Sequence, residues 1–159
     1  MENKNNIDSL LLQKAKNYAF LLLKFRPRSE KEIYERLKKK KFNAQIIKGA
    51  LFFLKDKGFI DDKYFAKAWI ESRIKKPLGF RKLKSELRIK GIDEEIIDFQ
   101  INEIKENYPE ADIVARIAKE KFEKTKGIVP QKAKRRIYGY LLRRGFSPEV
   151  VIDALTHEE

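Results

Sequence analysis

The chain has 159 residues and a formal net charge of +13, with 37 Lys and Arg residues against 24 Asp and Glu. Hydrophobic residues make up 42% of the chain, which is enough to form packed cores and excludes wholesale disorder. No cysteine is present, so disulfides and thiolate metal sites are excluded, as fits a reducing cytoplasm.

Apolar residues recur at helical spacing from the start of the chain. A first helix is predicted over residues 8–25 and stops before Pro27, which cannot continue a helix. The sequence 29–32 is a capping box that opens a second helix. Asn43 is typical of the N-cap of a third helix, which ends at Gly58, a residue suited to the left-handed helix terminus.

The same signals predict two further groups of helices. The second group begins at residue 61 or 62, breaks at 77–79, resumes at residue 80, turns at Gly91 and runs over 93–107. The third begins near Pro109, breaks around Gly127 and Pro130, turns at Gly145 and resumes at 147–148. Strand alternation and hairpin turns are absent from the sequence, so no β-sheet is predicted.

The three groups share one register. When Leu37, Leu87 and Leu141 are aligned, the same residue types follow at the same offsets, with a period of 50 and then 54 residues. Apolar residues follow at Phe42, Ile92 and Phe146, and residues typical of helix N-caps follow at Asn43, Asp93 and Ser147. A fixed period of this size predicts stacked helical units. The predicted fold is all-α, with tandem three-helix, helix-turn-helix-like repeats over 8–58, 59–108 and 109–156 forming an elongated array, straight or curved.

Residues for catalysis are scarce. The only histidine, His157, lies close to the C-terminus, where we expect an exposed tail residue rather than a general base or a metal ligand. The acidic clusters 61–62 and 93–95 could bind Mg²⁺, but both stand where a helix begins, and acidic residues there favour capping. The scattered glycines form no phosphate-binding loop. We therefore predict no enzymatic activity, no cofactor, no metal site and no small-molecule substrate.

Membrane association is also not expected. The longest stretch without a charged residue, 17–23, has seven residues, whereas a membrane-spanning helix needs roughly 20 apolar residues. The first four residues lack the apolar character of a secretory signal. These features predict a cytoplasmic protein with no membrane partner.

Positive charge gathers on the predicted middle helix of each repeat, beginning with the run Lys38–Lys41 in the first. Arg81, Lys84 and Arg88 share one stripe of their helix, at spacings of three and four residues. If the repeats stack regularly, these helices would form one basic track along a phosphate backbone or a polyanionic groove. The alternative is a solvated lysine-rich face that serves only solubility. The candidate contact residues are Arg73, Lys75, Lys76, Arg81, Lys84, Arg88, Lys132, Arg135, Arg136 and Arg143.

Aromatic residues could add base stacking to such a surface. The candidates are Phe52, Phe53, Tyr64, Phe65, Trp69, Phe122, Tyr138 and Tyr140. The helical spacing of Phe65 and Trp69 and their apolar neighbours favour core packing for the group. Tyr138 and Tyr140, close to Arg135 and Arg136, are the better surface candidates.

A central series of motifs carries a family resemblance. Lys57-Gly58-Phe59-Ile60-Asp61-Asp62-Lys63-Tyr64-Phe65-Ala66 is followed by Arg73, Lys76-Pro77-Leu78-Gly79, Leu83, Glu86-Leu87 and Lys90-Gly91-Ile92. This series closely resembles the RecX regulators of bacterial recombination, and 26–33 is similar to that family's first repeat. The resemblance extends over about 15–155 and is looser in the third repeat. The chain departs from the family in its lysine-rich first repeat and in Trp69, where tyrosine or another aromatic residue is expected.

The resemblance implies three tandem three-helix repeats and one main partner, the RecA recombinase filament on single-stranded DNA. Family members are similar in binding along that filament and restraining its ATPase and strand exchange, so the resemblance places the chain in homologous recombination, DNA repair and the SOS response. It supplies no catalytic residue and no metal site. Two alternatives stay open: a helix-turn-helix-like nucleic-acid-binding protein with no recombinase partner, and a scaffold whose charge serves only solubility.

Overall fold

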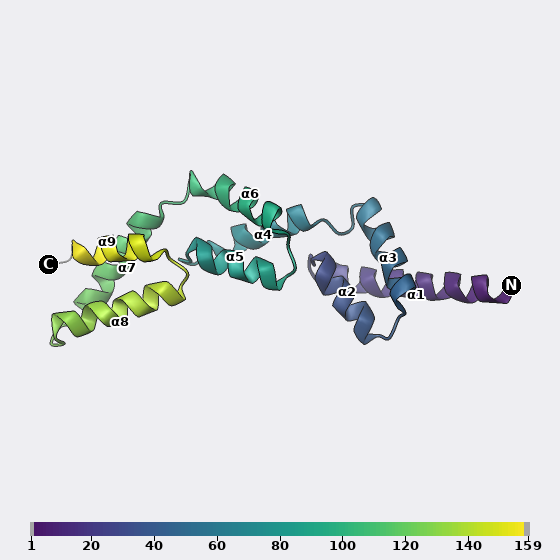
Figure 1. Cartoon of the computed structure of the whole chain (residues 1–159), viewed down its shortest axis with the longest axis horizontal. Coiled ribbons are helices and arrows are strands. Elements are labelled where there is room, and N and C mark those ends of the chain that lie inside the picture. The colour runs from purple at the N-terminus through teal and green to yellow at the C-terminus, as the bar shows by residue number, and fades with distance from the viewer. Residues whose placement is uncertain (1, 158–159) are drawn as a thin grey trace. The chain divides into compact units, whose positions relative to one another are not determined.

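The computed structural model describes residues 2–157 and contains, within that range, nine α-helices and no β-strand (Figure 1). The all-helical prediction is therefore confirmed. The helices are α1 (Glu2–Phe25), α2 (Glu30–Lys39), α3 (Ala44–Asp56), α4 (Asp62–Arg73), α5 (Phe80–Ile89), α6 (Glu94–Lys105), α7 (Glu110–Glu123), α8 (Pro130–Arg143) and α9 (Pro148–Thr156). None of the described helices is both long and apolar enough to cross a membrane.

The helix ends follow the local signals of the sequence. The Ser29 Oγ accepts the Glu32 N–H at 3.2 Å and the Glu32 carboxylate accepts the Ser29 N–H at 3.2 Å, which completes the capping box of α2. Asn43 and Ser147 cap α3 and α9 through the N–H groups three residues on. The turns that end α3 and α5 carry glycine in the left-handed region, with φ of 74° at Gly58 and 77° at Gly91.

One helix is longer than predicted, and another is longer than its counterparts in the other repeats. Helix α1 begins at Glu2 rather than near residue 8, because the residues before Ile7 include the good helix formers Glu2 and Lys4, and no Pro or Gly interrupts them. Helix α8 has 14 residues, whereas its counterparts α2 and α5 have 10 each. Its additional turn begins with Pro130 at a first-turn position, where the missing N–H is harmless.

The chain forms two compact units, which are described separately. The first unit takes the chain up to Ala68 together with Arg88–Ile96, and the second takes Trp69–Leu87 together with the chain from Ile97 onward. Each helix of the middle repeat is therefore divided between the units. The first unit thus includes the turn between α5 and α6, and the second includes the connection between α4 and α5. The predicted domain boundaries near residues 58 and 108 stay a prediction.

The core of the first unit forms where α1, α2 and α3 pack against one another. Small residues allow the close approach of α1 and α3, since Ala15, Ala19 and Ala50 are fully buried between larger neighbours. Helix α2 adds Ile33 and Leu37, both fully buried. The remaining fully or largely buried members are Leu22, Ile46, Ile47, Leu51, Leu54 and Ile60.

The core of the second unit includes the packed face of α7, α8 and α9. Phe146, directly after the Gly145 turn, is its largest fully buried side chain, and Leu141 and Val151 are also fully buried. The aligned leucines of the repeat, Leu37, Leu87 and Leu141, all have 0% exposure. The register found in the sequence is therefore the register of the buried faces.

Candidate interaction surface

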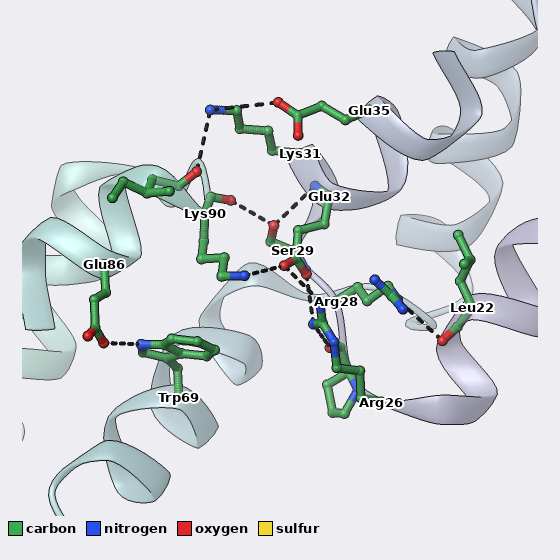
Figure 2. Close-up of polar contacts among 12 residues, drawn as sticks. Leu22, Arg26, Arg28, Ser29, Lys31, Glu32, Glu35, Trp69, Glu86 and Lys90 are labelled. Atoms are coloured by element: carbon green, nitrogen blue, oxygen red, sulfur yellow. Dashed lines mark hydrogen bonds and ion pairs between the residues drawn. The ribbon is translucent and has the colours of Figure 1, made fainter. Parts of the chain in front are cut away.

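Arg73, a predicted contact residue, holds two helices of the second unit together. Its Nη2 and Nε atoms donate to the two Glu86 carboxylate oxygens at 2.7 and 3.0 Å. The Trp69 Nε1–H donates to the same carboxylate at 3.0 Å, as Figure 2 shows. Burial disfavours ionisation of Glu86, but the hydrogen bonds from Arg73 and Trp69 outweigh it and hold the pKa of this carboxyl below its usual range. The geometry gives Arg73 a structural task, linking the end of α4 to α5.

Two further predicted cations of the middle repeat are paired with acidic residues of α6. The Lys84 Nζ lies 2.8 Å from the Asp98 carboxylate, and Arg88 pairs with Glu94 through two hydrogen bonds. Such partly exposed pairs contribute about 0–1 kcal/mol each and can open at little cost. Arg81, the third residue of the stripe, is exposed and has no ion pair among the described residues. The central stripe is thus less positive than the sequence indicates.

Helix α8 brings the largest group of predicted contact residues together. Lys132, Arg135, Arg136 and Arg143 are all exposed, and none has an ion pair within residues 2–157. The helix contains no acidic residue. Spacings of three, four and seven residues place these cations along one side, and the Arg143 guanidinium lies over Gly139, 3.3 Å from where a Cβ atom would stand. The alignment of this row with the other basic helices stays a prediction.

Lysines outside the candidate set extend the exposed positive surface. Lys75 and Lys76, which were in that set, are exposed after the end of α4. The run Lys38–Lys41 at the end of α2 was not among the candidate contact residues, although each of its lysines is exposed. The Lys40 Nζ lies 5.0 Å from the ring centre of Tyr18. The signal was plain in the sequence, because residues 1–55 hold 14 Lys and Arg against five Asp and Glu.

The aromatic predictions are partly wrong. Phe65 is buried, as predicted, but Phe52 is 73% exposed and Tyr64 64% exposed. Both lie on the outward sides of α3 and α4, so the core packing predicted from the spacing of Phe65 and Trp69 does not extend to them. Tyr138 and Tyr140 are instead partly buried against the core of the third repeat, with Lys121 Nζ 3.7 Å from the ring centre of Tyr140.

Sequence reasoning also missed a set of contacts between the first and second repeats, which we name the first junction. The Ser29 O–H donates to the Lys90 carbonyl at 2.7 Å, and the Lys90 ammonium donates to Glu32 at 2.6 Å (Figure 2). Arg26 donates to the same carboxylate at 3.0 and 3.1 Å. Burial disfavours ionisation of Glu32, yet the hydrogen bonds from Arg26 and Lys90 prevail, so the pKa of its carboxyl is below the usual value.

A second junction joins the second and third repeats within the second unit. The Gly79 N–H donates to the Arg144 carbonyl at 2.8 Å, and the Arg81 N–H donates to the Gly145 carbonyl at 3.1 Å. The Arg144 guanidinium returns two hydrogen bonds to the Pro77 carbonyl, at 2.8 and 3.1 Å. Lys90 and Arg144 occupy equivalent positions of the second and third repeats, three residues after Leu87 and Leu141. Their shared register, each directly before a turn glycine, is the signal that could have identified them.

Of the two acidic clusters, 61–62 contributes the predicted helix cap through Asp61, and capping by 93–95 stays a prediction. The Asp61 carboxylate accepts the N–H groups of Lys63 and Tyr64 at the start of α4. Across residues 2–157, no group of three or more His, Asp or Glu side chains is placed to hold a metal ion. His157 is exposed, with its Nε2 atom 3.5 Å from Asp153.

Comparison with known protein families matches all three repeats in order. The model of the first three-helix domain of RecX matches residues 15–54, that of the second matches 61–98, and that of the third matches 110–155. The chain belongs to the RecX family. The resemblance carried by the Gly58–Asp62 motif is therefore confirmed, and so is the division into three-helix repeats.

RecX proteins of distant bacteria are similar over nearly the whole chain. The regulatory protein RecX of Chlorobium phaeobacteroides (strain BS1) is 38% identical over 144 residues, which cover 90% of this chain and 92% of the relative. That of Mycobacterium sp. (strain KMS) is 32% identical over 151 residues, covering 92% and 82%. The crystal structure of RecX from Lactobacillus salivarius shares the fold, with a TM-score of 0.83 at 20% identity, covering 94% of this chain and 97% of that one. These relatives support a regulatory role.

Proposed function

We propose that this protein binds the RecA–single-stranded-DNA filament and inhibits the ATPase and strand exchange of the recombinase. The proposal is carried by the match of three consecutive RecX domains to 15–54, 61–98 and 110–155. Relatives that are similar over almost the same length are named regulatory proteins, which supports regulation rather than catalysis.

The exposed cations supply a physical basis for binding a filament. A RecA filament on DNA carries phosphate charge along its length, and a protein of net charge +13 is drawn to such a polyanion. The α8 row and the Lys38–Lys41 run lie in different repeats, so weak contacts at each would add through effective concentration. A regulator that contacts several neighbouring protomers at once would hinder the changes that accompany ATP turnover.

The first test is the single-stranded-DNA-dependent ATPase of the cognate RecA, measured while this protein is titrated in. With DNA in excess, we expect inhibition at well below one copy per RecA protomer. A loss of ATPase that begins only when the protein suffices to coat the DNA would identify competition for DNA instead. No change at any ratio would contradict the proposal.

Charge reversal on α8 tests the predicted contact surface. The triple variant Arg135→Glu, Arg136→Glu, Arg143→Glu should weaken filament binding by about tenfold or more, because each removed phosphate contact lowers affinity. A matched control reverses three exposed cations of the same repeat, Arg116, Lys119 and Lys124, and gives the same net charge. Equal losses in both variants, measured by filament co-sedimentation, would show that overall charge and not the α8 row determines binding.

A nucleic-acid-binding protein without a recombinase partner is the second candidate. It is favoured by the turn between α2 and the Asn43-capped α3, which follows four exposed lysines in a helix-turn-helix-like arrangement. Binding of this kind should weaken steeply as salt rises, whereas docking on a protein surface should retain part of its affinity. If the charge serves only solubility, no DNA binding is expected at moderate salt.

A further inference from the structure

A pocket of about 440 Å³ opens in the first unit between the turn that follows α1 and the turn that follows α3. Leu23 and Pro27 line it from one side, and Phe59 and Tyr64 line it from the other. The two aromatic rings are 51% and 64% exposed, and neither side chain belongs to the buried core. An apolar recess with exposed rings at its edge is the kind of surface that a partner covers.

The aromatic side of the pocket is held in place from behind. The ring of Phe59 meets Phe20 edge to face, with 4.8 Å between the ring centres, and Phe53 lies 6.4 Å away and nearly parallel. The Lys16 Nζ lies 3.9 Å from the centre of the Phe53 ring. Because three rings and a cation support one another, Phe59 presents a fixed surface rather than a mobile side chain.

Polar groups stand at the edge of the same pocket. The Arg28 Nε–H donates to the Leu22 carbonyl at 3.3 Å, and the other guanidinium N–H groups have no partner among the described residues. Burial, aided by the neighbouring charge of Arg26 and opposed by that of Glu32, lowers the pKa of Arg28. Asp61 uses its Oδ1 atom to cap α4, and its Oδ2 atom accepts no hydrogen bond within residues 2–157. The pocket therefore offers donors and an acceptor beside flat apolar surface.

This combination fits a flat heteroaromatic ring with polar edges. We propose that the pocket binds an unpaired base of single-stranded nucleic acid, which stacks on Tyr64 and Phe59 and hydrogen-bonds with Arg28 and Asp61. A peptide side chain could use the rings, but it would leave the donor and acceptor at the edge without a role. A base inside a duplex could not enter, because its faces are already stacked.

The charge around the pocket agrees with this ligand. Lys57 and Lys63 adjoin the lining residues in the sequence, and both are exposed without an ion pair among the described residues. They can neutralise the phosphates on either side of a bound base. The site requires no recombinase, so it adds to the proposed filament regulation and can be tested apart from it.

The test measures binding of the full chain to a fluorescently labelled oligothymidine by anisotropy, at moderate salt and without recombinase. Tyr64→Ala should weaken binding about tenfold, whereas Tyr64→Phe should stay within about twofold of the unsubstituted protein, since the ring alone stacks. Tyr34→Ala is the matched control, because Tyr34 is an exposed tyrosine of the same unit outside the pocket. The salt dependence should be the same in all three variants, because none changes the charge.

An oligonucleotide of the same length with abasic sites separates stacking from charge. It should bind the unsubstituted protein about tenfold more weakly than oligothymidine, and Tyr64→Ala should bind both almost equally. Circular dichroism and Trp69 emission verify that each variant is folded. Equal binding of Tyr64→Ala and Tyr34→Ala, equal binding of the abasic strand, or no binding by the unsubstituted protein would each overturn the proposal. If ATPase inhibition persists in that case, only the base pocket has failed; if the pocket binds DNA but the ATPase is unaffected, only the filament proposal has failed.

Discussion

The two junctions between repeats occupy the same register but are built from different parts of the chain. Ser29 and Gly79, which are 50 residues apart, both stand directly before a middle helix. In the first junction a side chain makes the contact, from the Ser29 O–H to the Lys90 carbonyl at 2.7 Å. In the second the main chain makes it, from the Gly79 N–H to the Arg144 carbonyl at 2.8 Å.

Helix capping explains the difference. The first N–H groups of a helix need acceptors, and in α2 the Ser29 Oγ accepts the Glu32 N–H while the Asp62 carboxylate of the second repeat accepts the Glu30 N–H at 2.9 Å. This leaves the Ser29 O–H free to donate to the next repeat. Gly79 has no side chain to cap α5, so the N–H groups of Gly79 and Arg81 bond to carbonyls of the third repeat instead. One residue before the helix thus decides whether neighbouring repeats meet through side chains or through the main chain, and how closely they approach.

Exchanging the glycine for serine should have the largest effect. In Gly79→Ser the new Cβ would lie 2.1 Å from the main chain of Gly145, so the second junction must open, at an expected cost of about 3 kcal/mol of unfolding free energy. Urea denaturation followed by the emission of Trp69, which lies in the same unit, measures this cost. Gly127→Ser is the control. A side chain there meets backbone strain, since φ is 93°, but no atom lies within 4 Å of the added Cβ. Similar costs in both variants would refute the importance of close approach.

The reciprocal exchange should cost less. Ser29→Gly removes the partly buried hydrogen bond to the Lys90 carbonyl and part of the cap, for an expected loss of about 1–2 kcal/mol. Native-state hydrogen exchange at the Ile33 amide, which bonds to the Ser29 carbonyl, reports this loss. Ser147→Gly, read at Val151, is the matched control and should lose only a few tenths of a kcal/mol, because its hydroxyl serves as a cap alone. If the two losses are alike, the contact with Lys90 contributes nothing.

Acidification should have the smallest of the three effects, and it should weaken the first junction but not the second. The pKa of Glu32 is lowered in the folded protein, so the stability that this carboxylate contributes is complete at neutral pH. That stability is lost as pH falls below the ordinary glutamate pKa of about 4.3 and through the lowered pKa of Glu32. The expected change is about 0.5–1 kcal/mol at the first junction, whereas the Pro77 carbonyl that binds Arg144 does not titrate. NMR titration of the Lys90 and Arg144 amides measures both. Glu32→Gln should abolish the response at Lys90, and an equal response at Arg144 would contradict the assignment.

Sequence signals that act over a few residues were sufficient for most of the fold. Ser29, Asn43 and Ser147 each cap a helix through groups three residues away, and all three were recognised. The same reasoning could not place ion pairs or contacts between repeats. Arg73 and Glu86 are 13 residues apart, and Arg144 and Pro77 are 67 apart, so their pairing depends on how helices pack and not on local pattern.

The exposed surface was only partly predictable for the same reason. Amphipathic spacing correctly placed Arg135 and Arg136 on the exposed side of α8. That helix contains no acidic residue that could pair with them. It could not show that Lys84 and Arg88 meet acidic residues of α6. Nor could it show that Tyr64 points outward while the adjacent Phe65 is buried, because that choice depends on the direction from which the core approaches α4.

Lys41 stands at the position that Gly91 and Gly145 occupy in the other repeats, and it shares their left-handed backbone with φ of 64°. At Gly91 an added Cβ would meet Lys31, and at Gly145 it would meet Lys82, so glycine is required where another repeat's middle helix docks on the turn. The turn at Lys41 receives no such helix among the described residues, and a lysine there costs only about 1 kcal/mol of backbone strain. The number of glycines at this turn position therefore matches the number of junctions rather than the number of repeats. In a longer member of the family, a glycine at this position is expected to indicate a further repeat in front of it.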